Sequence, residues 1–177
     1  KVVEYMLEGY QKGITPNPDI MCNKEIKFGL FFERAMTLGA DYIATGHYAR
    51  LRNTKEGTNI RKIEMAKDKN KDQSYFLSFI NPGVLQKTLF PIGNLTKPEV
   101  RAMARRLGLP NADRKDSQGI CFIGKLDFAD FLQRSVLCKT GDMVDISGKV
   151  LGRHAGLPLY TIGQRKGIGL SGGPYYV

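Results

Sequence analysis

The chain has few of the residues that build metal centres and disulfide frameworks. Its 177 residues include three cysteines and two histidines, and none of them falls at C-x-x-C or H-x-x-x-H spacing. This pattern argues against a zinc site, a secreted disulfide-rich domain and a dithiol redox protein. Long apolar runs are also missing, because none approaches the roughly 20 residues that span a bilayer. We therefore expect no metal centre, no membrane partner, and a reducing compartment such as the cytoplasm.

Positive charge is what the chain has in excess. Lysine and arginine number 27 against 17 aspartate and glutamate residues, which gives a formal net charge of +10 at pH 7. The cations gather in three groups, which are residues 50–71, residues 101–115, and Arg165 with Lys166. Such a surface suits a polyanion, since each neutralised phosphate releases counterions. Charge alone fits a merely soluble basic surface equally well.

Hydrophobic periodicity predicts an α/β arrangement in the first part of the chain. Apolar residues recur at helical spacing over residues 3–12 and 23–38. Between them, the prolines of residues 15–21 predict a stiff loop. A short buried strand over residues 42–44 then ends at Gly46. A helix, a strand and a glycine at the strand's carboxyl end are typical of α/β proteins, in which ligands gather at such ends.

The amino-acid composition and the expected elements change in the later part of the chain. We predict a hairpin over residues 49–65, a helix opened by the capping box Thr96–Glu99, and a short helix over residues 126–137. Beyond them glycine becomes frequent and the expected strands are short, as at residues 142–146 and 149–151. This change indicates a small second domain.

Both ends of the chain read as interior sequence. Lys1 lies within a helical pattern that no capping residue precedes, and Pro174–Val177 resembles the start of a strand. We expect the chain to be part of a longer protein.

Cys22 is the first candidate for sulfur chemistry. It lies one residue before Asn23, the expected N-cap of the helix over residues 23–38. A helix N-terminus stabilises a thiolate, and Lys24 adds positive charge. Asp19, three residues earlier, could move a proton or hold a polar ligand. A loop cysteine of no chemical role is the alternative.

Cys121 is the second candidate, and its setting points in two directions. Its apolar neighbours would raise the pKa of the thiol and favour a packed, inert cysteine. The glycines at 119 and 124 favour close approach of a ligand to the backbone. With Cys22 it could accept sulfur and resolve the product as a disulfide. Cys138 follows an apolar helix and is better explained as a core residue.

Two further places could make polar contacts. His47 directly follows the glycine at the expected strand end, although a lone histidine is more often structural. The segment Lys71–Gln73 offers three different hydrogen-bonding groups before a short apolar turn, and an ordinary helix cap is the alternative. Residues 171–173 are followed by aromatic residues instead of a helix, so we discount them as a phosphate-binding loop.

Five segments, in order along the chain, give the most specific signal. They are Thr15–Phe28, Ala44–Arg50, Lys71–Leu77, Asp116–Gly124 and Tyr160–Gly167. In these segments the sequence resembles the tRNA-specific 2-thiouridylases, a family of enzymes that thiolate the wobble uridine of certain tRNAs. The resemblance extends over essentially the whole chain, and five such segments are not expected by chance.

The resemblance implies an α/β fold. Residues 1–126 would be the later part of an adenine-nucleotide-hydrolase-like PP-loop ATPase domain with a parallel sheet. Residues 127–177 would be a small central α+β domain that helps to bind tRNA. The family's glycine- and serine-rich pyrophosphate loop has no counterpart in this sequence, and its C-terminal β-barrel is not reached. We expect this polypeptide alone to bind ATP poorly and to be inactive.

The resemblance also implies a reaction. ATP, together with Mg²⁺, would adenylate the C2 oxygen of the uridine, because the C2 carbonyl is otherwise a poor electrophile. Cys121 matches the cysteine that carries sulfur as a persulfide. Cys22 matches the partner that helps to release the sulfur and ends in a disulfide with Cys121. Asp19 matches a proton handler at the target base.

The remaining implied contacts are with nucleotides and partners. Gly46 would contact ATP. The residues implied to contact tRNA are Asn17, Pro18 and Asp19 at the target base, with His47, Lys71, Asp72 and Gln73 elsewhere. The expected partners are tRNA and a sulfur-relay protein or cysteine desulfurase, with the enzyme itself a monomer. Bacterial cytoplasm is the default location, although related enzymes serve mitochondria.

Two rival functions stay open. A different ATP-using tRNA sulfurtransferase would make another thionucleoside, which mass analysis of the modified nucleoside would distinguish. A catalytically silent basic RNA-binding module would bind tRNA without either cysteine and would form no disulfide between them.

Overall fold

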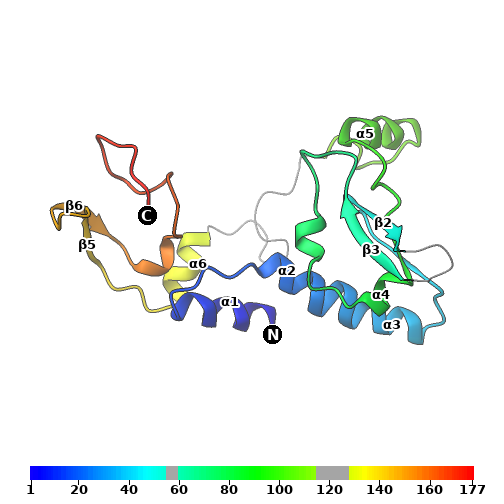
Figure 1. The fold of residues 1–177 in the computed structure, drawn as a ribbon, viewed down its shortest axis with the longest axis horizontal. Coiled ribbons are helices and arrows are strands. Elements are labelled where there is room, and N and C mark those ends of the chain that lie inside the picture. Colours follow the sequence, from blue (N-terminus) through cyan, green and yellow to red (C-terminus); the bar gives the residue numbers. More distant parts are fainter. Residues whose placement is uncertain (55–59, 115–127) are drawn as a thin grey trace. The chain divides into compact units, whose positions relative to one another are not determined.

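The computed structural model describes residues 1–54, 60–114 and 128–177, which fall into two compact units. One unit consists of residues 19–54 and 60–114, and the other of residues 1–18 and 128–177. Each unit has a hydrophobic core of its own. Figure 1 shows the order of the elements along the chain.

A continuous helical run carries Cys22. It comprises α2 (Pro18–Cys22), the π-helix η1 (Asn23–Leu30) and α3 (Phe31–Thr37). The junction residues have helical backbone angles, and Gly39 follows the run with a φ of +88°. The helix thus begins at Pro18 and not at the predicted N-cap Asn23, because the fixed φ of proline suits a first helical turn. Only the first part of the predicted loop over residues 15–21 is a loop.

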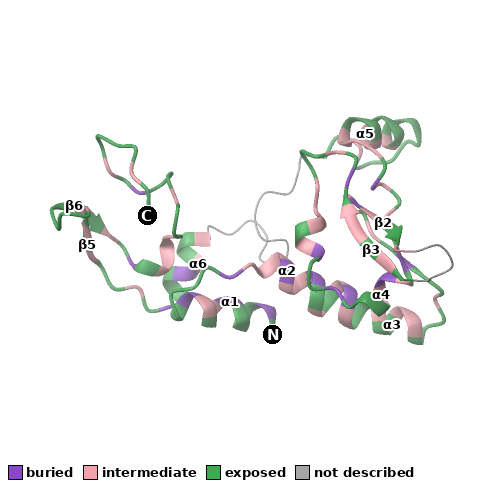
Figure 2. Ribbon diagram, viewed as in Figure 1, coloured by how far each residue is buried: buried purple, intermediate pink, exposed green. Residues whose placement is uncertain are grey.

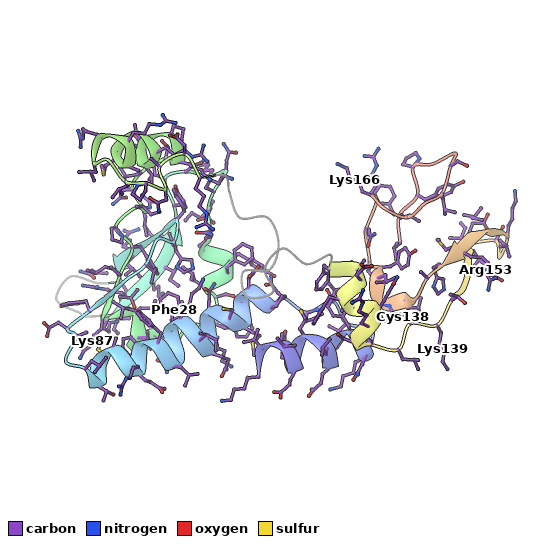
Figure 3. The ribbon with its side chains drawn as sticks, turned by 180° about the vertical axis from the view of Figure 1, so that it is seen from behind. Phe28, Lys87, Cys138, Lys139, Arg153 and Lys166 are labelled. Carbon is purple, nitrogen blue, oxygen red and sulfur yellow. The ribbon has the colours of Figure 1, made fainter. Side chains whose placement is uncertain are left out.

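The core of this unit lies between the helical run and two pairs of strands. β1 (Ile43–Ala44) pairs in parallel with β4 (Thr88–Leu89), and β2 (Ala49–Asn53) pairs antiparallel with β3 (Arg61–Met65). The buried core side chains are those of Phe28, Ile43, Ala49, Leu77, Ile80 and Leu85. Figure 3 shows Phe28 on the side of the helical run that faces the strands. The predicted strand and hairpin are confirmed, and so is the α/β class with parallel pairing.

Three short helical elements complete this unit. They are the 3₁₀ turn η2 (Ser74–Leu77), α4 (Pro82–Leu85) and α5 (Lys97–Arg106). α5 opens with the predicted capping box, in which the Thr96 amide donates to Glu99 Oε2 over 2.6 Å. Gly108, with a φ of +65°, follows its end. α5 lies on the opposite side of the β2–β3 hairpin from α3 and α4 (Figure 1).

In the second unit, α1 (Val2–Gln11) packs against α6 (Phe128–Ser135). Met6 and Tyr10 are buried there with Leu132 and Val136. Gly13 follows α1 with a φ of +72°, a left-handed angle that glycine readily adopts at a helix end. α1 thus packs with the later residues of the chain, and the domain boundary at residues 126/127 stays a prediction.

The rest of the second unit is a hairpin and irregular chain. β5 (Gly141–Val144) pairs antiparallel with β6 (Val150–His154), and the 3₁₀ turn η3 (Leu157–Leu159) follows. Val177 accepts a hydrogen bond from the Gly163 amide and donates one to the Gln164 carbonyl. Across the described ranges, no helix combines the length and the apolar character needed to cross a membrane.

Candidate functional site

Cys22 lies inside the helical run and not at its start. Asp19 is in the first turn of α2, and Cys22 is the last residue of α2 before η1 begins. Both side chains are half-buried. The favourable field of a helix N-terminus fades within the first turn. The predicted stabilisation of the Cys22 thiolate by a helix N-terminus is therefore wrong, because the helix begins four residues earlier, at Pro18.

Asn23 links this helix to the turn η2. Its side chain is only 3% exposed, and its Nδ2 donates a 2.9 Å hydrogen bond to the carbonyl of Phe76. The carbonyl oxygen Oδ1 of Asn23 has no hydrogen-bond partner among the described residues. The residue next to Cys22 thereby fixes the helix to the segment that follows Lys71–Gln73.

The loop before η2 is held by its own side chains. Gln73 Oε1 accepts a hydrogen bond from the Tyr48 amide over 3.0 Å, and the Gln73 amide donates to the Tyr48 carbonyl over 2.8 Å. Asp72 accepts from the Ala66 amide over 2.7 Å and from the Ser74 hydroxyl over 2.6 Å. Asp72 and Gln73 thus tie the loop to the ends of the β2–β3 hairpin, while the side chain of Lys71 is exposed.

Gly46 and His47 follow the carboxyl end of β1, as predicted. His47 is 8% exposed, with its ring centroid 5.8 Å from that of Phe28 and 6.2 Å from that of Phe90. Its Nδ1 makes a 2.9 Å hydrogen bond with Thr45 Oγ1. Burial lowers the pKa of His47 to about 4, and the charge of Lys27 acts in the same direction. The ring is therefore neutral at pH 7 and packs as a core side chain.

Gly46, in contrast, is exposed, and a Cβ atom added to it would meet nothing within 4 Å. An open backbone at the carboxyl end of a parallel strand is where α/β proteins receive nucleotides. The backbone at Gly46 therefore leaves room for a ligand at this strand end. Among the described residues, no group of three or more His, Cys, Asp and Glu side chains could hold a metal ion.

Comparison with known proteins assigns the chain to a family. Residues 1–125 match the family model described as tRNA methyl transferase HUP domain, and residues 129–177 match the one described as tRNA methyl transferase PRC-barrel domain. The chain belongs to this family. The names of individual curated relatives state a more specific activity than the descriptions of the two family models.

Three bacterial relatives of this HUP-domain family member carry the name tRNA-specific 2-thiouridylase MnmA. The protein of Akkermansia muciniphila is 52% identical over 171 residues, which is 97% of this chain and 47% of the relative. The protein of Legionella pneumophila strain Lens is 55% identical over 172 residues, with the same two coverages. The protein of Streptococcus sanguinis is 54% identical over 172 residues, or 97% of this chain and 46% of the relative. The chain thus spans about half the length of these relatives.

Most of the sequence-predicted residues lie in the same compact unit as Cys22. Asp19, Gly46, His47 and Lys71–Gln73 belong to the same unit as Cys22. Asn17 and Pro18, both half-buried, directly precede it in the chain. Cys121 and the segment Asp116–Gly124 lie outside the described residues.

Cys138 has a setting unlike that of Cys22. It is half-buried and lies in the segment between α6 and β5, where Figure 3 labels it. A Cβ atom added to Gly156 would lie 2.6 Å from Cys138 Cβ, so the glycine allows the two backbone segments to pack closely. This packing is consistent with the predicted structural role of Cys138.

The roles of two residues of the site were not predicted from the sequence. Asn23 was expected to be a helix N-cap, yet it lies within the helical run and is buried three residues after buried Ile20, on the same face of the helix. A polar residue at an apolar position of the periodic pattern was the available signal. Tyr48 anchors the Lys71–Gln73 loop through its backbone, for which the sequence carries no signal.

Proposed function

We propose that the protein to which this chain belongs catalyses ATP-dependent 2-thiolation of the wobble uridine of tRNA. The observation that carries the proposal is the identity of 52 to 55% over 97% of the chain to relatives named tRNA-specific 2-thiouridylase. Because the chain spans about half of those relatives, the activity is proposed for the whole protein. The open backbone at Gly46 and the excess of positive charge both agree with nucleotide and RNA substrates.

The sulfur chemistry is assigned to the two cysteines of the resemblance. Cys121 carries the incoming sulfur as a persulfide, whose terminal sulfur attacks C2 of the uridine. The Cys22 thiolate then attacks the Cys121 sulfur, which breaks the sulfur–sulfur bond and leaves the transferred sulfur on the base. The two cysteines end as a disulfide, so each cycle requires two electrons from an external thiol reductant. ATP, bound with Mg²⁺, supplies the activation that turns the C2 oxygen into a leaving group.

The other residues bind and orient the substrate. Asn17, Pro18 and Asp19 line the pocket for the target base, and Asp19 handles a proton there. Lys71 contacts the tRNA, with Asp72 and Gln73 holding its loop in place through their hydrogen bonds. The resemblance also assigns His47 to the tRNA contacts, and its buried ring would support them through its packing against Phe28 and Phe90.

The sulfur donor, the oligomeric state, the location and the domains are proposed from the same resemblance. A sulfur-relay protein or a cysteine desulfurase delivers the persulfide sulfur, and the enzyme works as a monomer in the bacterial cytoplasm. Residues 1–126 form part of the ATP-binding domain, and residues 127–177 form a small domain that contacts tRNA.

The first test is the identity of the product. The full-length protein is incubated with ATP, Mg²⁺, a sulfide source and unmodified tRNA, and the nucleosides of the digested tRNA are identified by mass. The proposal predicts 2-thiouridine at the wobble position that depends on ATP. Thiolation at another atom would indicate a different sulfurtransferase, and no modification with any tRNA would indicate an RNA-binding module.

Methyl transfer is the second candidate, because the matched family models are described as tRNA methyl transferase. It predicts a methylated nucleoside that requires an added methyl donor and no sulfide. The same mass measurement, repeated with a methyl donor in place of sulfide, separates the two activities.

A further inference from the structure

A row of cations on α5 has no part in the chemistry above. Lys97, Arg101 and Arg105 are spaced four residues apart, so they lie on one side of the helix at intervals of about 6 Å. Together with Pro98 they line an open hollow of about 420 Å³. All ten residues of α5 are described, and none of them is buried (Figure 2). We call Lys97, Arg101 and Arg105 the cationic face of α5.

The first turn of this helix is held firmly in place. The Lys97 amide donates a 2.9 Å hydrogen bond to Asp68 Oδ2, from the loop before Lys71. Glu99 accepts from the Thr96 amide and pairs with Lys67 Nζ over 2.9 Å. An interface that is already ordered loses less conformational entropy when a ligand binds.

Two carboxylates among the described residues contact α5. Asp68 caps α5, as above, and Asp113 pairs with Arg105 over 2.6 Å. Arg101 Nη2 donates a 3.1 Å hydrogen bond to the Arg114 carbonyl. The hollow is thus lined by three cationic side chains, of which Arg105 is paired with a carboxylate.

The cationic face continues the surface of the Lys71 loop. Burial, followed by the charges of Lys71 and Arg101, lowers the pKa of Lys97, so these three cations lie within electrostatic reach of one another. The same two cations act on Tyr48, whose pKa is raised by burial and by Asp68. Lys71 and Arg101 are thus both within electrostatic reach of Lys97 and of the half-buried Tyr48.

We propose that the cationic face of α5 binds the sugar–phosphate backbone of the substrate RNA, beyond the part of the RNA that Lys71 contacts. Guanidinium groups bind phosphate oxygens in a bidentate manner, and a row of cations suits the repeated charges of a nucleic-acid strand. An acidic protein partner fits less well, because the lining of the hollow offers no large apolar side chain to anchor it. The proposal rests on the proposed function in taking tRNA as the RNA.

The test measures tRNA affinity of the full-length protein as a function of salt. The variant is Lys97→Gln with Arg101→Gln, since glutamine is a good helix former and keeps the backbone amide that Asp68 accepts from. The control is Arg106→Gln, an exposed cation of the same helix outside the lining of the hollow. Arg101→Glu against Arg106→Glu repeats the comparison with a single charge reversal.

The double variant is expected to lower the slope of log Kd against log salt by about two, one for each lost phosphate contact. Affinity at low salt falls roughly tenfold, while Arg106→Gln stays close to the unmodified protein. A slope equal to that of the control overturns the proposal. Unchanged tRNA affinity with impaired sulfur delivery from a donor protein also overturns it, in favour of a protein docking site.

Binding and product formation separate this proposal from the proposed function. The unmodified protein could make no 2-thiouridine while the double variant still shows a smaller slope of log Kd for tRNA against log salt. In that case α5 binds RNA as proposed, and the proposed thiolation activity is wrong. If 2-thiouridine forms and the slope is the same in the double variant, the proposed thiolation activity is supported and the proposed RNA binding by α5 is wrong.

Discussion

Asn23 Nδ2 donates a 2.9 Å hydrogen bond to the carbonyl of Phe76, and this bond joins two segments that lie 53 residues apart in the chain. One segment is the helical run that carries Cys22, and the other is the turn after the Lys71–Gln73 loop. This buried amide, together with the core shared by Phe28 and Leu77, therefore helps to fix the candidate resolving cysteine relative to the candidate RNA loop.

Replacing Asn23 by alanine should destabilise the full-length protein by about 1–2 kcal/mol, because it leaves the Phe76 carbonyl without its donor. Urea unfolding measures the change. Asn94→Ala is the matched control, since Asn94 is exposed, and its effect should stay within about 0.5 kcal/mol. Equal effects of the two substitutions would mean that the Asn23 bond contributes nothing specific.

Gln73→Leu should loosen the loop that carries Lys71, because Gln73 Oε1 is the acceptor for the Tyr48 amide. A hydrogen bond of this kind contributes about 0.5–1.5 kcal/mol to stability. Its loss should therefore make hydrogen exchange of the Tyr48 amide up to roughly tenfold faster than in the unmodified protein. Gln73→Glu keeps an oxygen acceptor and should restore much of the protection. Exchange at Tyr48 that is the same in all three proteins would contradict this role of the side chain.

The buried His47 should make stability depend on pH. Its pKa is about 4 in the folded protein, below the ordinary value of 6.5, so the unfolded chain takes up the proton first as pH falls. The stability contribution is complete above pH 6.5 and is lost progressively between pH 6.5 and pH 4, by on the order of 3 kcal/mol.

His47→Gln should remove this part of the pH dependence, which urea unfolding at several pH values would measure. The shallow dependence expected for the variant has to be compared with the unmodified protein in the same buffers, since carboxylates such as Glu99 also titrate below this range. A His47 ring that titrates near 6.5 by NMR would contradict its burial.

Local signals in the sequence were sufficient for several elements. The capping box Thr96–Glu99 opens α5, and Gly13 and Gly108 follow helices with left-handed φ angles. A polar stretch in the middle of residues 49–65 was enough to predict the hairpin. Each of these signals acts between residues close in sequence, so no knowledge of the tertiary structure was needed.

The start of the Cys22 helix could not be predicted in the same way. Pro16 and Pro18 favour both a stiff loop and a first helical turn, and the tertiary structure selects the helix from Pro18 onward. The π-helix η1 also departs from the 3.6-residue period on which the sequence analysis relied. The contacts of Asp72 and Gln73 are with Ala66 and Tyr48, which the chain brings close only by folding.

The most direct test of the account is a single turnover without external reductant. Full-length protein loaded with persulfide sulfur is mixed with ATP and tRNA, and its peptides and the tRNA nucleosides are then analysed by mass. The account predicts one Cys22–Cys121 disulfide for each 2-thiouridine, with product lost in Cys121→Ser and Cys22→Ser but retained in Cys138→Ser. Product that persists without Cys121, or forms without the disulfide, would contradict the assigned roles of the two cysteines.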